Sequence, residues 1–96
     1  MTANGAGGNI LHPGDISGQA NVIYQRIGEV LMAAGCSYAD VVSTREYITT
    51  TEGYRDSANV RRRYFGDPFP AATGVLVAGL LRPGALIEIE AVAKIP

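Results

Sequence analysis

Hydrophobic and polar positions alternate toward the C-terminal end of the chain, in two apolar runs on either side of Arg82-Pro83-Gly84. Both runs are rich in β-branched residues and Pro-Gly is typical of a turn, so residues 69–95 are predicted to form a β-hairpin. Side chains of a strand point alternately to opposite faces. One face of the second strand is therefore apolar, with Ile87, Ile89, Ala91 and Ala93, and the other carries Glu88, Glu90, Val92 and Lys94.

Between Asp15 and Gly35, apolar residues recur at spacings of three and four, which predicts an amphipathic helix. The predicted stripe consists of Ala20, Ile23, Ile27, Val30, Leu31 and Ala34. Asp15 is a suitable N-cap, and Gly35 can adopt the left-handed conformation that ends helices. Residues 1–14 are dominated by Gly, Asn and Pro and are expected to be a loop, apart from a short extended piece at residues 10–11.

Residues 41–50 are rich in Val, Thr, Tyr and Ile and are predicted to form a strand. Alternation places Val42, Thr44, Glu46 and Ile48 on one face, and Ser43, Arg45 and Tyr47 on the other. Glu46 interrupts the face that helices should cover. Two interpretations are open: Glu46 lies near a sheet edge and reaches water, which we favour, or it is partly buried, where a charge is costly.

Residues 52–65 are predicted to form a second helix, with Tyr54, Ala58, Arg61 and Phe65 on one stripe. Residues 61–63 are three arginines, which cover much of the helix circumference, so at least one guanidinium must lean toward the packed side. The triple lacks the interleaved aromatic residues and the net positive charge of a nucleic-acid site. We favour a solvated helix end whose cations complement the helix dipole.

The element order of helix, strand, helix, strand, strand predicts an α+β domain, with both helices on one face of a mixed sheet. With three strands, the other face and at least one edge of the sheet stay open. Because open edges pair with other chains, we expect the protein to associate with another chain.

Composition narrows the classes of function. The chain has 96 residues, 47% hydrophobic, and a net charge of −1, which fits one domain over residues 1–96 and favours neither nucleic acid nor a membrane as partner. No signal peptide or membrane span is apparent, so we expect a cytoplasmic protein. The single cysteine, Cys36, and the single histidine, His12, predict no disulfide, no metal site and no cofactor.

Five segments follow one another in a characteristic order: Gln19 with the first helix ending Ala-Ala-Gly35, the Ala-Asp-Val-Val-Ser-Thr strand, the aromatic-led second helix, Phe-Pro-Ala-Ala-Thr73, and Ile-Glu-Ile-Glu-Ala-Val-Ala93. Together they resemble the RidA/YjgF family of enamine/imine deaminases, which is also called endoribonuclease L-PSP-like. The resemblance implies a chorismate-mutase-like fold, a homotrimer, and small-molecule clefts between subunits for an imine, enamine or 2-keto acid. Ribonuclease activity is not expected, because the chain has no basic stripe and no pair of histidines.

The resemblance implies a binding site that this chain has altered. In the family, the first strand of the hairpin predicted for residues 69–95 begins with Pro-Ala-Arg-Ser or Pro-Ala-Arg-Thr, and the arginine binds the substrate carboxylate. The corresponding residue is Ala72, followed by Thr73. Losing a charge-assisted pair of this kind costs about 1.5–3 kcal/mol of binding free energy.

Three further positions carry over from the family pattern. Its helical asparagine falls on Ala58, and a cysteine that is common two places after the arginine falls on Gly74. Glu88 matches the glutamate implied to activate or orient water, and it is the predicted catalytic residue. Ala58, Ala72, Thr73 and Gly74 are the corresponding substrate-binding positions.

Two other arginines could supply the missing cation. Arg45 shares the predicted face of Glu88, and Arg61 lies on the packed stripe of the second helix. We include Arg45 among the substrate-binding candidates, although pairing with Glu46, Glu88 or Glu90 is the favoured interpretation for both.

Family members begin with a hairpin before the first helix, and this chain is expected to start just after it. A truncated piece, a late start codon and a variant completed by a partner are the three explanations left open.

The resemblance and its altered positions leave three candidate functions. They are a degenerate metabolite-binding trimer with weak or lost deaminase activity, an active imine hydrolase of altered substrate range that uses Glu88, and a non-enzymatic assembly module. We favour the first.

Overall fold

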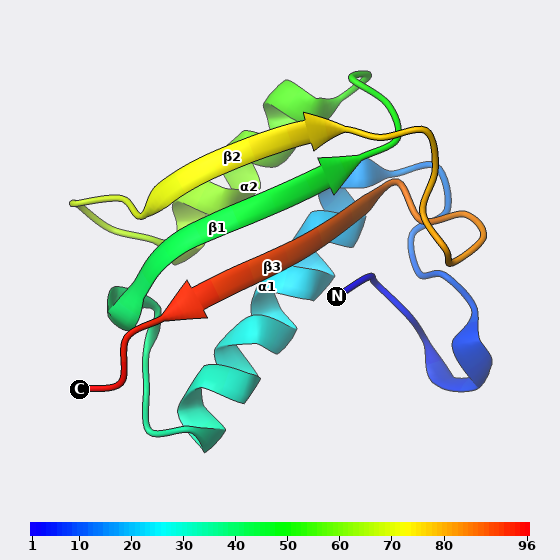
Figure 1. The fold of residues 1–96 in the computed structure, drawn as a ribbon. Helices are drawn as coiled ribbons and strands as arrows, with labels where there is room; N and C mark the ends of the chain where they lie inside the picture. Colours follow the sequence, from blue (N-terminus) through cyan, green and yellow to red (C-terminus); the bar gives the residue numbers. More distant parts are fainter.

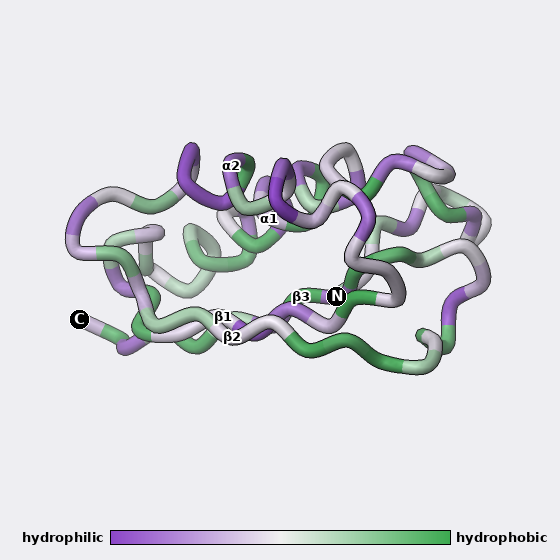
Figure 2. Tube along the Cα trace, turned by 90° about the horizontal axis from the view of Figure 1, so that it is seen from above, coloured by the Kyte–Doolittle hydropathy of each residue, from purple (hydrophilic) through white to green (hydrophobic).

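Two helices cover one face of a three-stranded sheet, and the opposite face of the sheet is open (Figure 1). The computed structural model describes residues 1–96. The elements are α1 (Ile16–Ala33), β1 (Val41–Ile48), α2 (Tyr54–Tyr64), β2 (Ala71–Leu76) and β3 (Ile87–Ala93), with 3-10 turns at Ala6–Gly8 and Tyr38–Asp40. Figure 2 shows the helices as one layer and the strands as the other. The predicted α+β fold, with both helices on one face of a mixed sheet, is confirmed.

β1 is the central strand of the sheet. The strand order is β2-β1-β3, with β1 parallel to β2 and antiparallel to β3. The predicted hairpin is therefore wrong, because β1 lies between β2 and β3. The turn itself exists, since the Ala85 N–H donates to the Arg82 carbonyl at 3.1 Å, but it lies inside a connection that passes the end of β1. β1 forms backbone hydrogen bonds with a neighbour on each side. The residues of a turn do not show whether a third strand lies between the two strands that the turn connects.

α1 forms as predicted. The Asp15 Oδ1 accepts from the Gly18 N–H at 3.0 Å, and Gly35 ends the segment at a φ of 76°. The buried stripe includes Ile23, Tyr24 and Ile27 of the helix, whereas the predicted stripe member Val30 is 60% exposed. The core forms where this stripe meets Ile87 and Ile89 of β3, which lie on the predicted apolar face.

A bulge near the start of β1 changes which residues are buried. The pairing of β1 with β3 shifts between Val41 and Ser43, so Val41 points inward and Val42 outward. The prediction of Val42 on the covered face is therefore wrong. From Thr44 onward the alternation is as predicted, with Thr44, Glu46 and Ile48 buried.

The N-terminal segment is more ordered than its composition indicates. Ala3 is fully buried, and the Leu11 N–H donates to its carbonyl at 2.8 Å. Met1 pairs with the outer edge of β3, where the Ile89 N–H donates to the Met1 carbonyl at 3.0 Å. Tertiary contacts with the core and with β3 thus order a segment that has few apolar residues of its own.

Candidate functional site

Glu46 is a buried carboxylate at the junction of the sheet with both helices. It lies in the central strand, faces the helices and is 1% exposed. The Tyr24 hydroxyl of α1 donates to Oε2, and the Tyr54 hydroxyl and Arg61 guanidinium of α2 donate to Oε1 at 2.7 and 3.2 Å. The favoured interpretation that Glu46 reaches water at a sheet edge is wrong, because β1 is central and covered. Three donors, one of them charged, compensate the buried charge.

Burial and the carboxylate of Glu46 together raise the pKa values of two tyrosines. Burial, followed by the negative charge of Glu46, raises the pKa of Tyr24. Burial, followed by the hydrogen bond to Glu46, raises the pKa of Tyr54 to about 12. Both hydroxyls therefore remain donors at neutral pH, and the group ties α1 and α2 to β1. A charged residue on an otherwise apolar strand face was the sequence signal for such a network; its donors could not be identified from sequence.

Ala72 lies at the β2 edge of the sheet and faces α2. It is aligned with Thr44 of β1 and lines a hollow of about 260 Å³, together with Arg61, Arg62, Phe65, Phe69 and Pro70. The Arg61 guanidinium is bound to Glu46, and the Arg62 guanidinium donates to Asn59 Oδ1 at 2.5 Å. Positive charge is therefore close to Ala72, but the charge of Arg61 is already paired.

Gly74 leaves room for the Tyr54 hydroxyl. Gly74 of β2 is aligned with Glu46 of β1. A β-carbon at Gly74 would overlap the Tyr54 hydroxyl, which donates to Glu46. Any larger side chain here would displace that donor. Ala58 is half-buried on α2, the helix that carries Tyr54 and Arg61.

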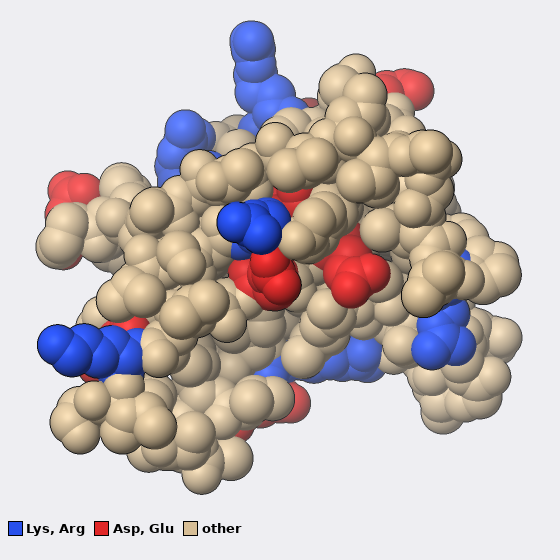
Figure 3. Space-filling model, in the orientation of Figure 1, with Lys and Arg blue, Asp and Glu red and all other residues tan.

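The open face of the sheet carries a second group of charges. Arg45 Nη1 lies 3.5 Å from Glu90 Oε1, to which the Tyr47 hydroxyl also donates at 3.0 Å. Thr73 is aligned with Arg45 and lines the same shallow hollow, of about 220 Å³. Figure 3 shows acidic groups over the middle of this face, with a basic group against them. The predicted pairing of Arg45 and Arg61 with glutamates is confirmed.

Glu88 also lies on the open face, aligned with Tyr47. Its side chain is 42% exposed, and Oε2 lies 3.8 Å from the amino terminus. It lines a hollow of about 360 Å³, which we call the Glu88 hollow, with Met1, Thr2, Asn4, Leu81, Arg82 and Pro83. Glu88 and Ala72 point to opposite faces of the sheet, so one chain does not bring them together.

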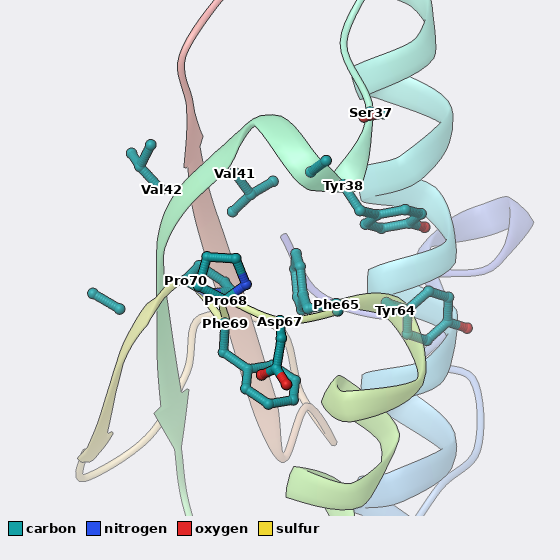
Figure 4. Close-up of a pocket in the computed structure, with 13 residues that line it drawn as sticks. Ser37, Tyr38, Val41, Val42, Tyr64, Phe65, Asp67, Pro68, Phe69 and Pro70 are labelled. Carbon is teal, nitrogen blue, oxygen red and sulfur yellow. The ribbon is translucent and has the colours of Figure 1, made fainter.

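A larger apolar groove, of about 640 Å³, lies beside the start of β1 (Figure 4). Phe65, Phe69 and Pro70 are among its lining residues, and Asp67 is its only charged one. The hydroxyls of Tyr38 and Tyr64 turn toward α1, where they donate to the Tyr24 carbonyl at 2.7 Å and to Asn21 Oδ1 at 2.5 Å. The two tyrosines therefore present their rings to the groove.

Comparison with known proteins identifies the family. Residues 2–95 match the family described as Endoribonuclease L-PSP. The chain is also 35% identical over 83 residues to the 2-iminobutanoate/2-iminopropanoate deaminase of Bos taurus. The chain belongs to the RidA/YjgF family. The resemblance read from the sequence is confirmed.

Other RidA/YjgF relatives agree in sequence and fold. The human 2-iminobutanoate/2-iminopropanoate deaminase is 35% identical over 80 residues, which cover 83% of this chain and 58% of the relative. A crystal structure of RidA from an Antarctic Psychrobacter is 25% identical with a TM-score of 0.88, and covers 99% of this chain and 76% of that one. A Mycobacterium tuberculosis member of the YjgF/YER057c/UK114 family is 37% identical with a TM-score of 0.78, over 94% and 70%.

The chain spans about 60% of the length of the bovine deaminase. Neither of its helices is both long and apolar enough to cross a membrane. No three His, Cys, Asp or Glu side chains are grouped to hold a metal ion.

The positions taken from the RidA/YjgF pattern lie on two sides of the sheet. Ala72 and Gly74 face α2, whereas Glu88 and Thr73 lie on the open face.

Proposed function

We propose that the protein is a RidA/YjgF-family binder of small metabolites whose deaminase activity is weak or lost. The ligands are imines, enamines or 2-keto acids, and the related deaminases are named for two 2-imino acids, 2-iminobutanoate and 2-iminopropanoate. Ala72 carries the proposal, because it offers a methyl group at the position that the resemblance assigns to the carboxylate-binding arginine. Of the two arginines that line the hollow of Ala72, Arg61 is bound to Glu46 and Arg62 donates to Asn59.

We place the ligand clefts between the copies of a cytoplasmic homotrimer. Glu88 and Ala72 face opposite sides of one sheet, so a cleft that uses both needs two chains. The uncovered face also exposes large apolar side chains, with Val42 51% and Val92 56% exposed, which favours cover by another copy. Analytical ultracentrifugation over a range of concentrations is expected to give the mass of three copies. A stable folded monomer would contradict the assembly.

The loss of activity is tested by restoring the arginine. Hydrolysis of 2-iminopropanoate by the unmodified chain is expected at nearly the rate in buffer, and Ala72→Arg is expected to raise it. Ala33→Arg is the matched control, because it adds the same side chain at an exposed position at the end of α1, outside the positions taken from the family pattern. A wild-type rate well above buffer that disappears in Glu88→Ala would show that activity has survived.

An active hydrolase of altered substrate range is the second candidate. It is supported by the exposed Glu88 carboxylate, which lines an open hollow and could orient water toward an imine without a carboxylate. Turnover of a neutral imine that is lost in Glu88→Gln is the expected result. Background rates for neutral imines would exclude this candidate.

A further inference from the structure

The Glu88 hollow contains one arginine that forms no ion pair. Arg45 and Arg61 are engaged by Glu90 and Glu46, whereas Arg82 lies in the connection between β2 and β3, has no carboxylate within ion-pair distance and is exposed. The only hydrogen bond of its guanidinium is a long one, from Nη1 to the Gly8 carbonyl at 3.4 Å. Most of its guanidinium donors are therefore available to a ligand.

Arg82 and Glu88 line the same hollow but do not pair with each other. Glu88 Oε2 lies 3.8 Å from the Met1 ammonium, which lines the hollow as well, so the Arg82 guanidinium stays unpaired in a volume of about 360 Å³, the size of a small-molecule site. The Asn4 side chain adds a donor on the same wall. Its Oδ1 accepts from the Thr2 hydroxyl at 2.7 Å, and its amide NH₂ has no hydrogen-bond acceptor within the chain.

We propose that Arg82 binds the carboxylate of a small 2-oxo or 2-imino acid in the Glu88 hollow, and so replaces the cation absent at Ala72. The inference rests on the proposed function and names the residue that selects its ligand. The planar guanidinium matches a carboxylate in a bidentate arrangement.

The position of Leu81 fits this role. Leu81 is fully exposed next to Arg82 and lines the same hollow. An apolar side chain at the rim gains cover when a ligand occupies the hollow. One chain thus contributes an anion-binding fork, an amide donor, a carboxylate and an apolar side chain to the proposed cleft between copies.

Binding of 2-oxobutanoate to the full chain, measured by calorimetry and by amide chemical shifts, tests the proposal. 2-Butanone, which lacks the carboxylate, is the neutral probe. Arg82→Ala is expected to weaken 2-oxobutanoate binding about ten- to hundredfold and to leave 2-butanone binding unchanged. Arg82→Lys, which keeps the charge but not the fork, is expected to fall between the wild type and Arg82→Ala.

Two control variants decide which arginine acts. Arg55 is exposed on α2 and has no hydrogen bond or ion pair, so Arg55→Ala is expected to bind 2-oxobutanoate as the wild type does. Unchanged binding in Arg82→Ala, or an equal loss in Arg45→Ala, would overturn the assignment to Arg82 while leaving the proposed function intact. A wild type that binds neither probe would overturn both.

Discussion

The Tyr54 hydroxyl occupies the space in which a β-carbon at Gly74 would lie, and from there it donates to Glu46 at 2.7 Å. A glycine of β2 thus permits a hydrogen bond between α2 and β1. A larger residue at Gly74, where the resemblance places a cysteine, would therefore disturb the buried Glu46 network.

The first prediction concerns this steric relationship. Gly74→Ala is expected to destabilise the fold by about 1–3 kcal/mol, since the new methyl group must displace the Tyr54 hydroxyl. In a Tyr54→Phe background the same change is expected to cost less, with a coupling of at least about 0.5 kcal/mol. Urea unfolding of the four proteins of this double-mutant cycle gives the coupling. Additive costs would show that the hydroxyl is not the obstacle.

The second prediction compares two tyrosines that both donate to a glutamate. Tyr24 is fully buried and donates to Glu46, whereas the Tyr47–Glu90 bond is exposed. Tyr24→Phe is expected to lower the unfolding free energy by about 2 kcal/mol, because a buried carboxylate loses a donor. Tyr47→Phe is the matched control and is expected to change it by about 0.5 kcal/mol or less. Equal effects would contradict the role given to burial.

The third prediction concerns alkaline pH. The pKa of Tyr54 rises from 10.0 in an ordinary environment to about 12 in the fold, and that of Tyr24 rises as well. Above pH 10 the unfolded tyrosines lose protons that the folded ones keep, so this contribution to stability is complete below pH 10 and is lost as the pH rises toward 12. Urea midpoints measured across this range are expected to fall. A decline that is equally steep in Tyr54→Phe would refute the assignment to Tyr54.

The fourth prediction concerns Thr44, which is aligned with Ala72. Thr44 is 3% exposed, and its Oγ1 is a buried side-chain atom without a hydrogen-bond partner. Thr44→Val removes that unsatisfied hydroxyl at nearly constant volume and is expected to raise the unfolding free energy by about 1 kcal/mol. Thr73→Val, on the exposed face of the neighbouring strand, is expected to stay within about 0.5 kcal/mol. A clear loss of stability in Thr44→Val would reveal a partner for Oγ1.

The sequence by itself determined the two helices, the cap at Asp15, the two faces of β3 and the family. These features follow from local spacing, from capping chemistry and from motifs that stand in a fixed order along the chain. From the same information, the resemblance predicts Ala72 as the altered position and Glu88 as the carboxylate that remains.

Only the tertiary structure decided the rest. Turn chemistry at Pro83-Gly84 indicated a hairpin, but the strand that pairs with β2 and β3 is β1, and strand neighbours are selected by long-range burial rather than by the turn. The position of Glu46 was also decided by the tertiary structure. Its charge predicted exposure to water, but α1 and α2 supply the donors that allow it to be buried. Arg82, a turn residue in the sequence, becomes a ligand-binding candidate because the connection brings it into the hollow of Glu88.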